Sequence, residues 1–204
     1  MEMYPIAVLA SGRGSNLEAL IQAQKAGELK GEIALVISDN PRARALEKAA
    51  RYGIPHQVIE PAAFPDRETF DEALIACIQQ HRIQLIVLAG YMRLLSPRVI
   101  RAFPRKIINI HPSLLPAFPG LNAQEQAWRY GVKYSGCTVH FVDEGMDTGP
   151  IIAQRVVPVL PGDTPADLAD RILQEEHRLY PQVVRWLAEG RISLEGRKVI
   201  IKGE

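Results

Sequence analysis

Ile107-Ile-Asn-Ile-His-Pro-Ser113 is the stretch around which we expect the fold to be organised. Isoleucines alternate with Asn109 and His111, so a strand here would carry both polar side chains on one face. Pro112 lacks an N–H and disfavours a helical backbone at His111, so the strand should end there. Ligands bind at the carboxyl ends of strands in open α/β sheets. An amide donor and an imidazole at such an end suit oxyanion stabilisation and proton transfer, although a hydrogen-bonded structural pair would give the same pattern.

The bulk composition is that of an ordinary globular protein. The 204 residues are 47% hydrophobic and 23% charged, which suits one domain with a sizeable core. With 24 basic and 23 acidic residues the net charge is +1, which gives no indication of a nucleic-acid surface. No apolar run approaches the roughly 18 residues of a membrane span, and the start has no secretion-signal pattern. Cys77 and Cys137 lack metal-site spacing, so we expect free thiols in a reducing cytoplasm.

Apolar strands and amphipathic helices alternate along the chain. Strands are expected at residues 6–10, 33–38, 56–60, 84–89, 107–111, 135–142 and 150–160, and helices at about 16–27, 39–51, 66–80, 97–103, 121–130 and 164–186, with a hairpin at 192–201. Such alternation is typical of right-handed βαβ crossovers. The predicted fold class is α/β: a Rossmann-like, mostly parallel twisted sheet flanked by helices, with an antiparallel C-terminal part.

Ser11-Gly-Arg-Gly-Ser-Asn16 lies between the first strand and the first helix. Backbone N–H groups of a glycine-rich turn, together with a helix N-terminus, can hold a phosphate. The spacing is neither GxGxxG nor a Walker loop, so a monophosphate fits better than a dinucleotide. Ser15 and Asn16 are also good helix N-caps. A plain strand–helix turn with a good cap is the simpler alternative.

Two further features attract attention. The loop Gly90-Tyr-Met-Arg-Leu-Leu95 is unusually apolar, so its side chains either pack under a neighbour or line an apolar ligand slot. Glu176 falls on the apolar stripe of the last long helix, where a carboxylate is costly unless it is paired or faces a polar pocket. Asp39 is interpreted as a helix cap, and Cys77 as a core residue rather than a nucleophile.

Three segments together resemble one enzyme family: the Ser11–Asn16 loop, the motif Asn109-Ile-His-Pro-Ser113 and the acidic loop around Met146-Asp-Thr-Gly149. Asn-x-His-Pro-Ser with a later Asp-x-Gly is similar to the folate-dependent formyltransferase superfamily. The early Gly-x-Gly-Ser-Asn loop resembles its phosphoribosylglycinamide formyltransferase branch. The resemblance runs from about Ile6 to Trp186. It implies one formyltransferase domain over 1–204, with a phosphate-binding half at about 1–100, a catalytic half at about 101–190 and a tail hairpin at 191–204.

The resemblance also implies roles for particular residues. His111 would be the acid/base, Asn109 would hold the formyl oxygen, and Asp147 would orient His111 and favour its protonated form. The ribonucleotide would be bound by Gly12, Arg13, Gly14, Ser15, Asn16 and Glu176, and the folate by Arg67, Met92, Arg93, Leu94, Leu95 and Asn109. Arg13 stands at a variable position, so only its backbone is assigned. Relatives often carry a histidine where this chain has 121–125, so no proton-transfer role is assigned there.

The implied activity is formyl transfer from 10-formyltetrahydrofolate to N1-(5-phosphoribosyl)glycinamide in de novo purine synthesis. The partners would be these two small molecules, without metal, nucleic acid or membrane, and the enzyme would be a cytoplasmic monomer or homodimer. Another 10-formyltetrahydrofolate-dependent formyltransferase or hydrolase is the nearest alternative. A phosphate-sensing binding module is a different class of alternative. It would explain the glycine-rich loop but not the set Asn109, His111 and Asp147.

Overall fold

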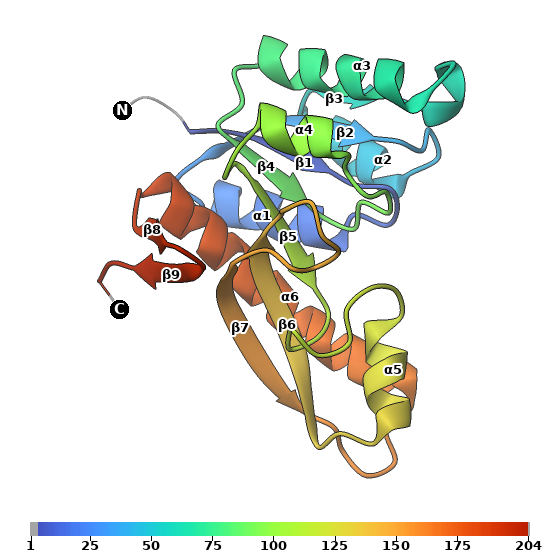
Figure 1. Cartoon of the computed structure of the whole chain (residues 1–204), viewed down its shortest axis with the longest axis vertical. Coiled ribbons are helices and arrows are strands. Elements are labelled where there is room, and N and C mark those ends of the chain that lie inside the picture. Colours follow the sequence, from blue (N-terminus) through green and yellow to red (C-terminus); the bar gives the residue numbers. More distant parts are fainter. Residues whose placement is uncertain (1–3, 204) are drawn as a thin grey trace. The chain divides into compact units, whose positions relative to one another are not determined.

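The computed structural model describes residues 4–203, which fall into two compact units divided between Ile108 and Asn109. The first unit contains β1 (Pro5–Leu9), α1 (Ser15–Lys25), β2 (Glu32–Ser38), α2 (Arg44–Arg51), β3 (His56–Val58), the 3₁₀ turn η1 (Pro61–Ala63), α3 (Arg67–Gln80), β4 (Leu85–Leu88) and α4 (Pro97–Ala102). β5 (Ile107–His111) runs from the first unit into the second. The second unit continues with α5 (Ala123–Tyr130), β6 (Tyr134–Phe141), β7 (Ile151–Pro158), α6 (Pro165–Ala188), β8 (Ile192–Glu195) and β9 (Lys198–Ile201) (Figure 1).

The strands follow the hydrogen-bonded order β3-β2-β1-β4-β5-β6-β7, with β8 and β9 as a separate pair. β1 pairs in parallel with β2 and with β4, β2 pairs in parallel with β3, and β6 pairs antiparallel with β7. This confirms the predicted mostly parallel Rossmann-like sheet with an antiparallel C-terminal part. β8 and β9 form an antiparallel hairpin within the expected tail. The grouping of the whole chain as one domain stays a prediction.

The order of the first four strands places a topological switch point between β1 and β4. From β1 the chain moves to β2 and β3, then returns to β4 on the other side of β1. Right-handed crossovers therefore put α1 and α2 on one face of the sheet and α3 on the other. Loops at the carboxyl ends of the two strands beside a switch point form the usual ligand crevice of such sheets. Here they are the loop after Leu9 and the loop after Leu88.

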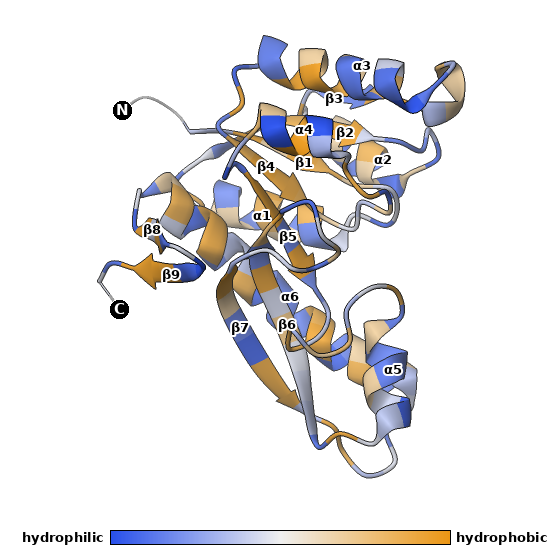
Figure 2. Cartoon of the chain, in the orientation of Figure 1, coloured by the Kyte–Doolittle hydropathy of each residue, from blue (hydrophilic) through white to orange (hydrophobic). Residues whose placement is uncertain are grey.

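The central strands of the first unit are buried on both faces and read as continuous apolar runs. β1 has four fully buried residues, and all four residues of β4 are buried. Figure 2 shows unbroken hydrophobic colour along β4, whereas α3 and α4 alternate hydrophilic and hydrophobic segments. Cys77 on α3 is 5% exposed, which confirms that it is a core residue.

Two helix starts differ from the sequence prediction. The N-cap of α1 is Gly14, not Ser15 or Asn16, and its φ is +67°. A Cβ on Gly14 would lie 2.9 Å from Cα of Ala45, so the close approach of α2 requires glycine here. The prediction that Asp39 caps α2 is wrong, because α2 begins at Arg44 with Ala43 as N-cap. Asn40 instead makes the turn, accepting from the backbone N–H of Arg42 at 3.0 Å.

The start of α6 agrees with its sequence signal. Thr164 accepts from the backbone N–H of Asp167 at 3.2 Å, and the Asp167 carboxylate accepts from the N–H of Thr164 at 2.8 Å. This reciprocal capping box satisfies two backbone donors that a helix end leaves free. Pro165 at the first helical position adds a residue whose φ already suits a helix.

We expect Thr164→Ala to lower the free energy of unfolding by about 1 kcal/mol, because the exposed cap hydroxyl is lost while the core is untouched. Chemical denaturation of the purified protein measures this change. Thr164→Ser is the matched control, since it keeps the hydroxyl and should stay close to wild type. Equal stability of the alanine variant and wild type would show that the cap contributes nothing.

Candidate functional site

The loops at the switch point of the first unit contact one another through Ser11. Its backbone N–H donates to the carbonyl of Gly90 at 3.0 Å, and its hydroxyl accepts from the N–H of Met92 at 2.9 Å. Its carbonyl accepts from the Asn40 side-chain amide at 3.2 Å. Ser11 thus joins the glycine-rich loop 12–16 to the loop 90–95. The structure therefore brings these two predicted binding segments together.

The glycine-rich loop is built for backbone recognition. Gly12 and Arg13 are exposed, whereas Gly14 and Asn16 are buried. The carbonyl of Gly12 accepts from the N–H of Ala45 at 3.1 Å, which holds the loop against the start of α2. N–H groups in this turn and at the first turn of α1 are suited to an anion. The Arg13 side chain is exposed, so only the backbone of this residue is assigned to the anion site.

The loop 90–95 displays its apolar side chains instead of packing them. Met92 is 68% exposed and Leu94 is 63% exposed. Arg67 fixes the loop backbone by donating to the carbonyl of Leu94 at 2.6 Å. Arg93 lies over the Phe70 ring, 5.4 Å from its centroid. Of the two interpretations of this loop, packing under a neighbour is wrong for Met92 and Leu94, and the apolar ligand slot stays a prediction.

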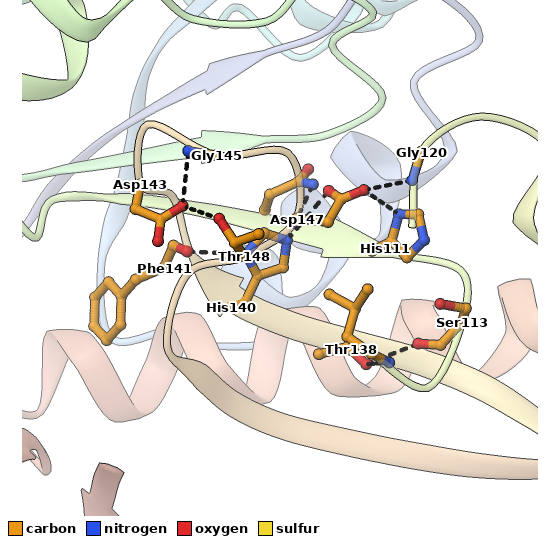
Figure 3. Close-up of polar contacts among 12 residues, drawn as sticks. His111, Ser113, Gly120, Thr138, His140, Phe141, Asp143, Gly145, Asp147 and Thr148 are labelled. Carbon is orange, nitrogen blue, oxygen red and sulfur yellow. Dashed lines mark hydrogen bonds and ion pairs between the residues drawn. The ribbon is translucent and has the colours of Figure 1, made fainter. Parts of the chain in front are cut away.

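The second unit brings His111 and Asp147 together (Figure 3). His111 Nδ1 lies 3.4 Å from Oδ2 of Asp147, and that oxygen also accepts from the N–H of Gly120 at 2.8 Å. The two side chains are 6% and 13% exposed, so the contact is largely shielded from water. Asp147 belongs to the loop between β6 and β7, whereas His111 ends β5. The structure thus supports the predicted pair, whose roles stay a prediction.

The hydrogen-bond pattern of His111 indicates which ring nitrogen carries a hydrogen. Nε2 lies 2.8 Å from the carbonyl oxygen of Phe118, which can only accept, so Nε2 carries a hydrogen. Nδ1 is the ring nitrogen that faces the Asp147 carboxylate. The same Phe118 carbonyl also accepts from the Ser113 hydroxyl at 3.3 Å.

His140 is a site residue that the sequence interpretation missed. Its Nδ1 lies 2.9 Å from the carbonyl of Phe141, so Nδ1 donates and Nε2 is left as an acceptor in the neutral ring. Asn109 Nδ2 lies 3.4 Å from that Nε2, and Oδ1 of Asp147 lies 3.7 Å from it. His140 therefore orients the Asn109 amide with its NH₂ inward.

The environment of His140 agrees with a neutral ring. Burial is the largest cause that lowers its pKa below the ordinary 6.5, while the Phe141 carbonyl and the Asp147 carboxylate oppose this shift. The residue is 2% exposed. The alternation predicted for 135–142 put His140 on the same face as Thr138, but only the structure shows that Thr138 contacts the Asn109–Ser113 segment. Thr138 donates to the carbonyl of Ser113 at 2.7 Å, directly after the Asn109–His111 motif.

The loop that carries Asp147 is closed by its own polar contacts. Asp143 accepts from the Thr148 hydroxyl at 2.6 Å and from the N–H of Gly145 at 3.1 Å. Asp147 itself has a φ of +55°, a region that non-glycine residues seldom adopt. Backbone strain of this kind persists only where surrounding contacts determine it, and it is common at functional sites.

Glu176 and Cys137 complete the account of the second unit. Glu176 is 7% exposed on the buried stripe of α6, as the helix periodicity predicted. Burial first, and the charge of Glu176 second, raises the pKa of the Cys137 thiol to about 12. A thiol with so high a pKa does not act as a nucleophile near neutral pH.

Residues 4–203 contain neither a metal-binding cluster nor a membrane-spanning helix. In that part of the chain, no cluster of three or more histidine, cysteine, aspartate or glutamate side chains is arranged to hold a metal ion. Over the same residues, no helix combines the length and apolarity that a bilayer crossing needs.

The model of the formyl transferase family matches residues 4–184. The chain belongs to the formyl transferase family. A phosphoribosylglycinamide formyltransferase of Bacillus subtilis is 46% identical over 91% of this chain and 95% of its own length. A trifunctional purine biosynthetic protein of Drosophila pseudoobscura pseudoobscura is 50% identical over 91% of this chain, which spans only 14% of that protein.

Solved structures of formyl transferases agree with this assignment. The crystal structure of glycinamide ribonucleotide transformylase 1 from Symbiobacterium toebii is 54% identical, covers 98% of this chain and 94% of its own, and has a TM-score of 0.95. A formyltetrahydrofolate deformylase from Pseudomonas syringae is 29% identical, with a TM-score of 0.91 over 98% of this chain and 66% of its own. Family members with different reactions therefore share this fold.

We expect the free energy of unfolding to fall as the pH is lowered from 7.5 towards 5.5. His140 has a lowered pKa in the folded protein. Below its ordinary value of 6.5, the unfolded chain therefore binds a proton at this residue that the folded chain does not bind, and this favours unfolding. One such group gives a slope of at most about 1.4 kcal/mol per pH unit. His140→Gln lacks this titration and should lose less stability over the same range.

Urea unfolding at several pH values measures the effect. His56→Gln, which removes an exposed histidine from β3, is the matched control and should follow the wild-type curve. A His140→Gln curve parallel to wild type would show that His140 does not cause the pH dependence.

Proposed function

We propose that this chain transfers the formyl group of 10-formyltetrahydrofolate to the amine of N1-(5-phosphoribosyl)glycinamide, a step of de novo purine synthesis. The observation that carries the proposal is the similarity of this chain to proteins named for this activity, which extends over nearly the full length of this chain and of each of those proteins. The paired His111 and Asp147, beside an oriented Asn109 amide, supply groups that suit acyl transfer to an amine.

The residues of the second unit would supply the chemistry. The substrate amine attacks the formyl carbon, a new C–N bond forms, and the bond from that carbon to the folate nitrogen breaks. Asn109 would donate to the formyl oxygen as negative charge develops on it, and protonated His111 would add a second donor when its Nε2–H turns from the Phe118 carbonyl to the substrate. His111 would also deliver a proton to the leaving nitrogen and take one from the attacking amine. Asp147 would hold the imidazolium in place.

The residues of the first unit would bind the substrates. The backbone of Gly12 to Asn16 would hold the ribonucleotide phosphate, and Ser15 adds a hydroxyl at the first turn of α1. Met92 and Leu94 would contact the folate ring, while Arg67 and Arg93 would face its carboxylates. Glu176, on α6 of the second unit, is assigned to the glycinamide part of the ribonucleotide. These roles rest on the family resemblance and, for Met92 and Leu94, also on the exposure of their side chains.

The setting proposed for the enzyme follows from the same chemistry. Both substrates are small molecules, and the chain carries a net charge of only +1, which gives little attraction for nucleic acid. We assign the enzyme to the cytoplasm, as a monomer or homodimer without a metal.

Hydrolysis of 10-formyltetrahydrofolate is the second candidate. The likeness to a formyltetrahydrofolate deformylase favours it, because the same groups would serve water as the attacking nucleophile. The glycine-rich loop argues for a phosphorylated acceptor instead.

Spectrophotometry of the folate product, with and without phosphoribosylglycinamide, tests the proposal. We expect product only when the ribonucleotide is present, because its amine is the acceptor. Equal product formation without the ribonucleotide would establish the hydrolase. Absence of product in both cuvettes would reject both activities.

We expect His111→Ala to lower kcat by roughly 10²–10⁴-fold, the usual contribution of a positioned acid/base. Folate binding, measured by fluorescence or calorimetry, should persist because the folate contacts assigned to the first unit are unchanged. His56→Ala removes an exposed histidine and serves as the control. Near-normal turnover of His111→Ala would remove this residue from the mechanism.

A further inference from the structure

The C-terminal hairpin reaches the loop that carries Asp147. Arg197, in the turn between β8 and β9, donates from Nη2 to the carbonyl oxygen of Thr148 at 2.7 Å. Thr148 directly follows Asp147 in the sequence. A guanidinium from the end of the chain therefore holds the backbone next to the carboxylate that contacts His111.

This loop needs such support. Residues 142–150, between β6 and β7, belong to neither a helix nor a strand, and the loop is closed at its base by the Phe141 N–H, which donates to the Pro150 carbonyl at 2.9 Å. Asp147 is held at a positive φ and places one oxygen near His111 and the other near His140. A small backbone shift at Thr148 would move both oxygens. Displacements of about 1 Å are enough to cost substantial catalytic rate.

The hairpin is itself well anchored, so it can act as a brace. Arg191 and Lys202 close its open end through two hydrogen bonds, Nε of Arg191 to the Lys202 carbonyl at 2.7 Å and the Lys202 N–H to the Arg191 carbonyl at 2.9 Å. Arg191 also lies over the Trp186 ring, 5.8 Å from its centroid. Glu195 pairs with Lys198 across the turn, which leaves Gly196 and Arg197 at the tip.

Charge adds a reason for arginine at this tip. The loop contains three acidic residues, Asp143, Glu144 and Asp147, within five positions. A guanidinium placed beside it lowers their mutual repulsion and makes a charge-assisted bond to the carbonyl.

We propose that Arg197 is a positioning residue for the reaction: it holds the loop 143–149 so that Asp147 stays aligned with His111. The inference rests on the proposed function, since it gives Arg197 a role through Asp147. The residue touches neither substrate nor reacting atoms in this account. Its removal should therefore lower kcat and leave the KM of both substrates nearly unchanged.

The first test compares Arg197→Ala with Lys198→Ala, the adjacent exposed position in the same hairpin. We expect kcat to fall about three- to tenfold in Arg197→Ala, the scale of one solvent-exposed hydrogen bond, and to stay at wild type in Lys198→Ala. Arg197→Lys should retain part of the rate, and added guanidinium at low millimolar concentration should partly restore Arg197→Ala. Equal kcat of Arg197→Ala and wild type would overturn the proposal, as would a loss expressed only in KM.

A double-mutant cycle with Asp147→Asn separates positioning from a general structural effect. If Arg197 acts through Asp147, Arg197→Ala should add little further loss of kcat to Asp147→Asn. If the fold-loss of kcat in the double variant equals the product of the losses in the two single variants, Arg197 acts independently of the carboxylate and the inference is overturned.

A readout that needs no activity distinguishes this inference from the function itself. Hydrogen–deuterium exchange of the intact protein should accelerate over residues 143–149 in Arg197→Ala, but not in Lys198→Ala, while the exchange of α6 stays unchanged. Unchanged exchange in the loop would overturn the brace even in an active enzyme. Faster exchange in a protein without formyl transfer would support the brace and reject the proposed function.

Discussion

The polar cluster of His111, His140 and Asp147 in the second unit depends on the position of the Asp147 carboxylate. Its two oxygens reach His111, His140 and the N–H of Gly120, which come from three separate segments. One negative charge offsets only one positive charge in a site largely closed to water. The two imidazoles around it differ in their surroundings: burial lowers the pKa of His140, whereas Nε2 of His111 donates to the Phe118 carbonyl.

The requirement to place this carboxylate shapes the loop that holds it. The chain must leave β6, turn Asp147 inward at a φ of +55° and return into β7. Such a path brings backbone very close together. A Cβ on Gly149 would lie 1.7 Å from the Phe141 carbonyl oxygen, and one on Gly145 would lie 2.1 Å from the Thr148 hydroxyl. The two glycines are therefore consequences of the aspartate's position.

Local patterns predicted most of the fold because the forces that form each element act over short distances. The alternation of Asn109 and His111 with isoleucines indicated β5, Pro112 indicated its end, and Thr164 with Asp167 indicated the start of α6. The start of α2 was predicted wrongly, since Asp39 resembles a cap but the chain first makes a turn at Asn40 and the helix begins only at Arg44. His140 was missed for a related reason: its role comes from Asn109 and Phe141 across the fold, and alternation alone describes any core strand. Asp147 was assigned by family resemblance and not by pattern.

The two units show different ways of making a binding surface. In the first unit, most of the contacts involve backbone groups. Ser11 joins the loops 12–16 and 90–95 through hydrogen bonds of its N–H and hydroxyl, and Arg67 donates to a carbonyl of the loop 90–95. In the second, side chains meet side chains, as the imidazole and carboxylate of His111 and Asp147 do. A backbone surface constrains glycine and small residues such as Gly14 while leaving an exposed side chain such as Arg13 free to vary. A side-chain centre constrains the residue types themselves, and it extends that constraint to the segments that hold those residues in place.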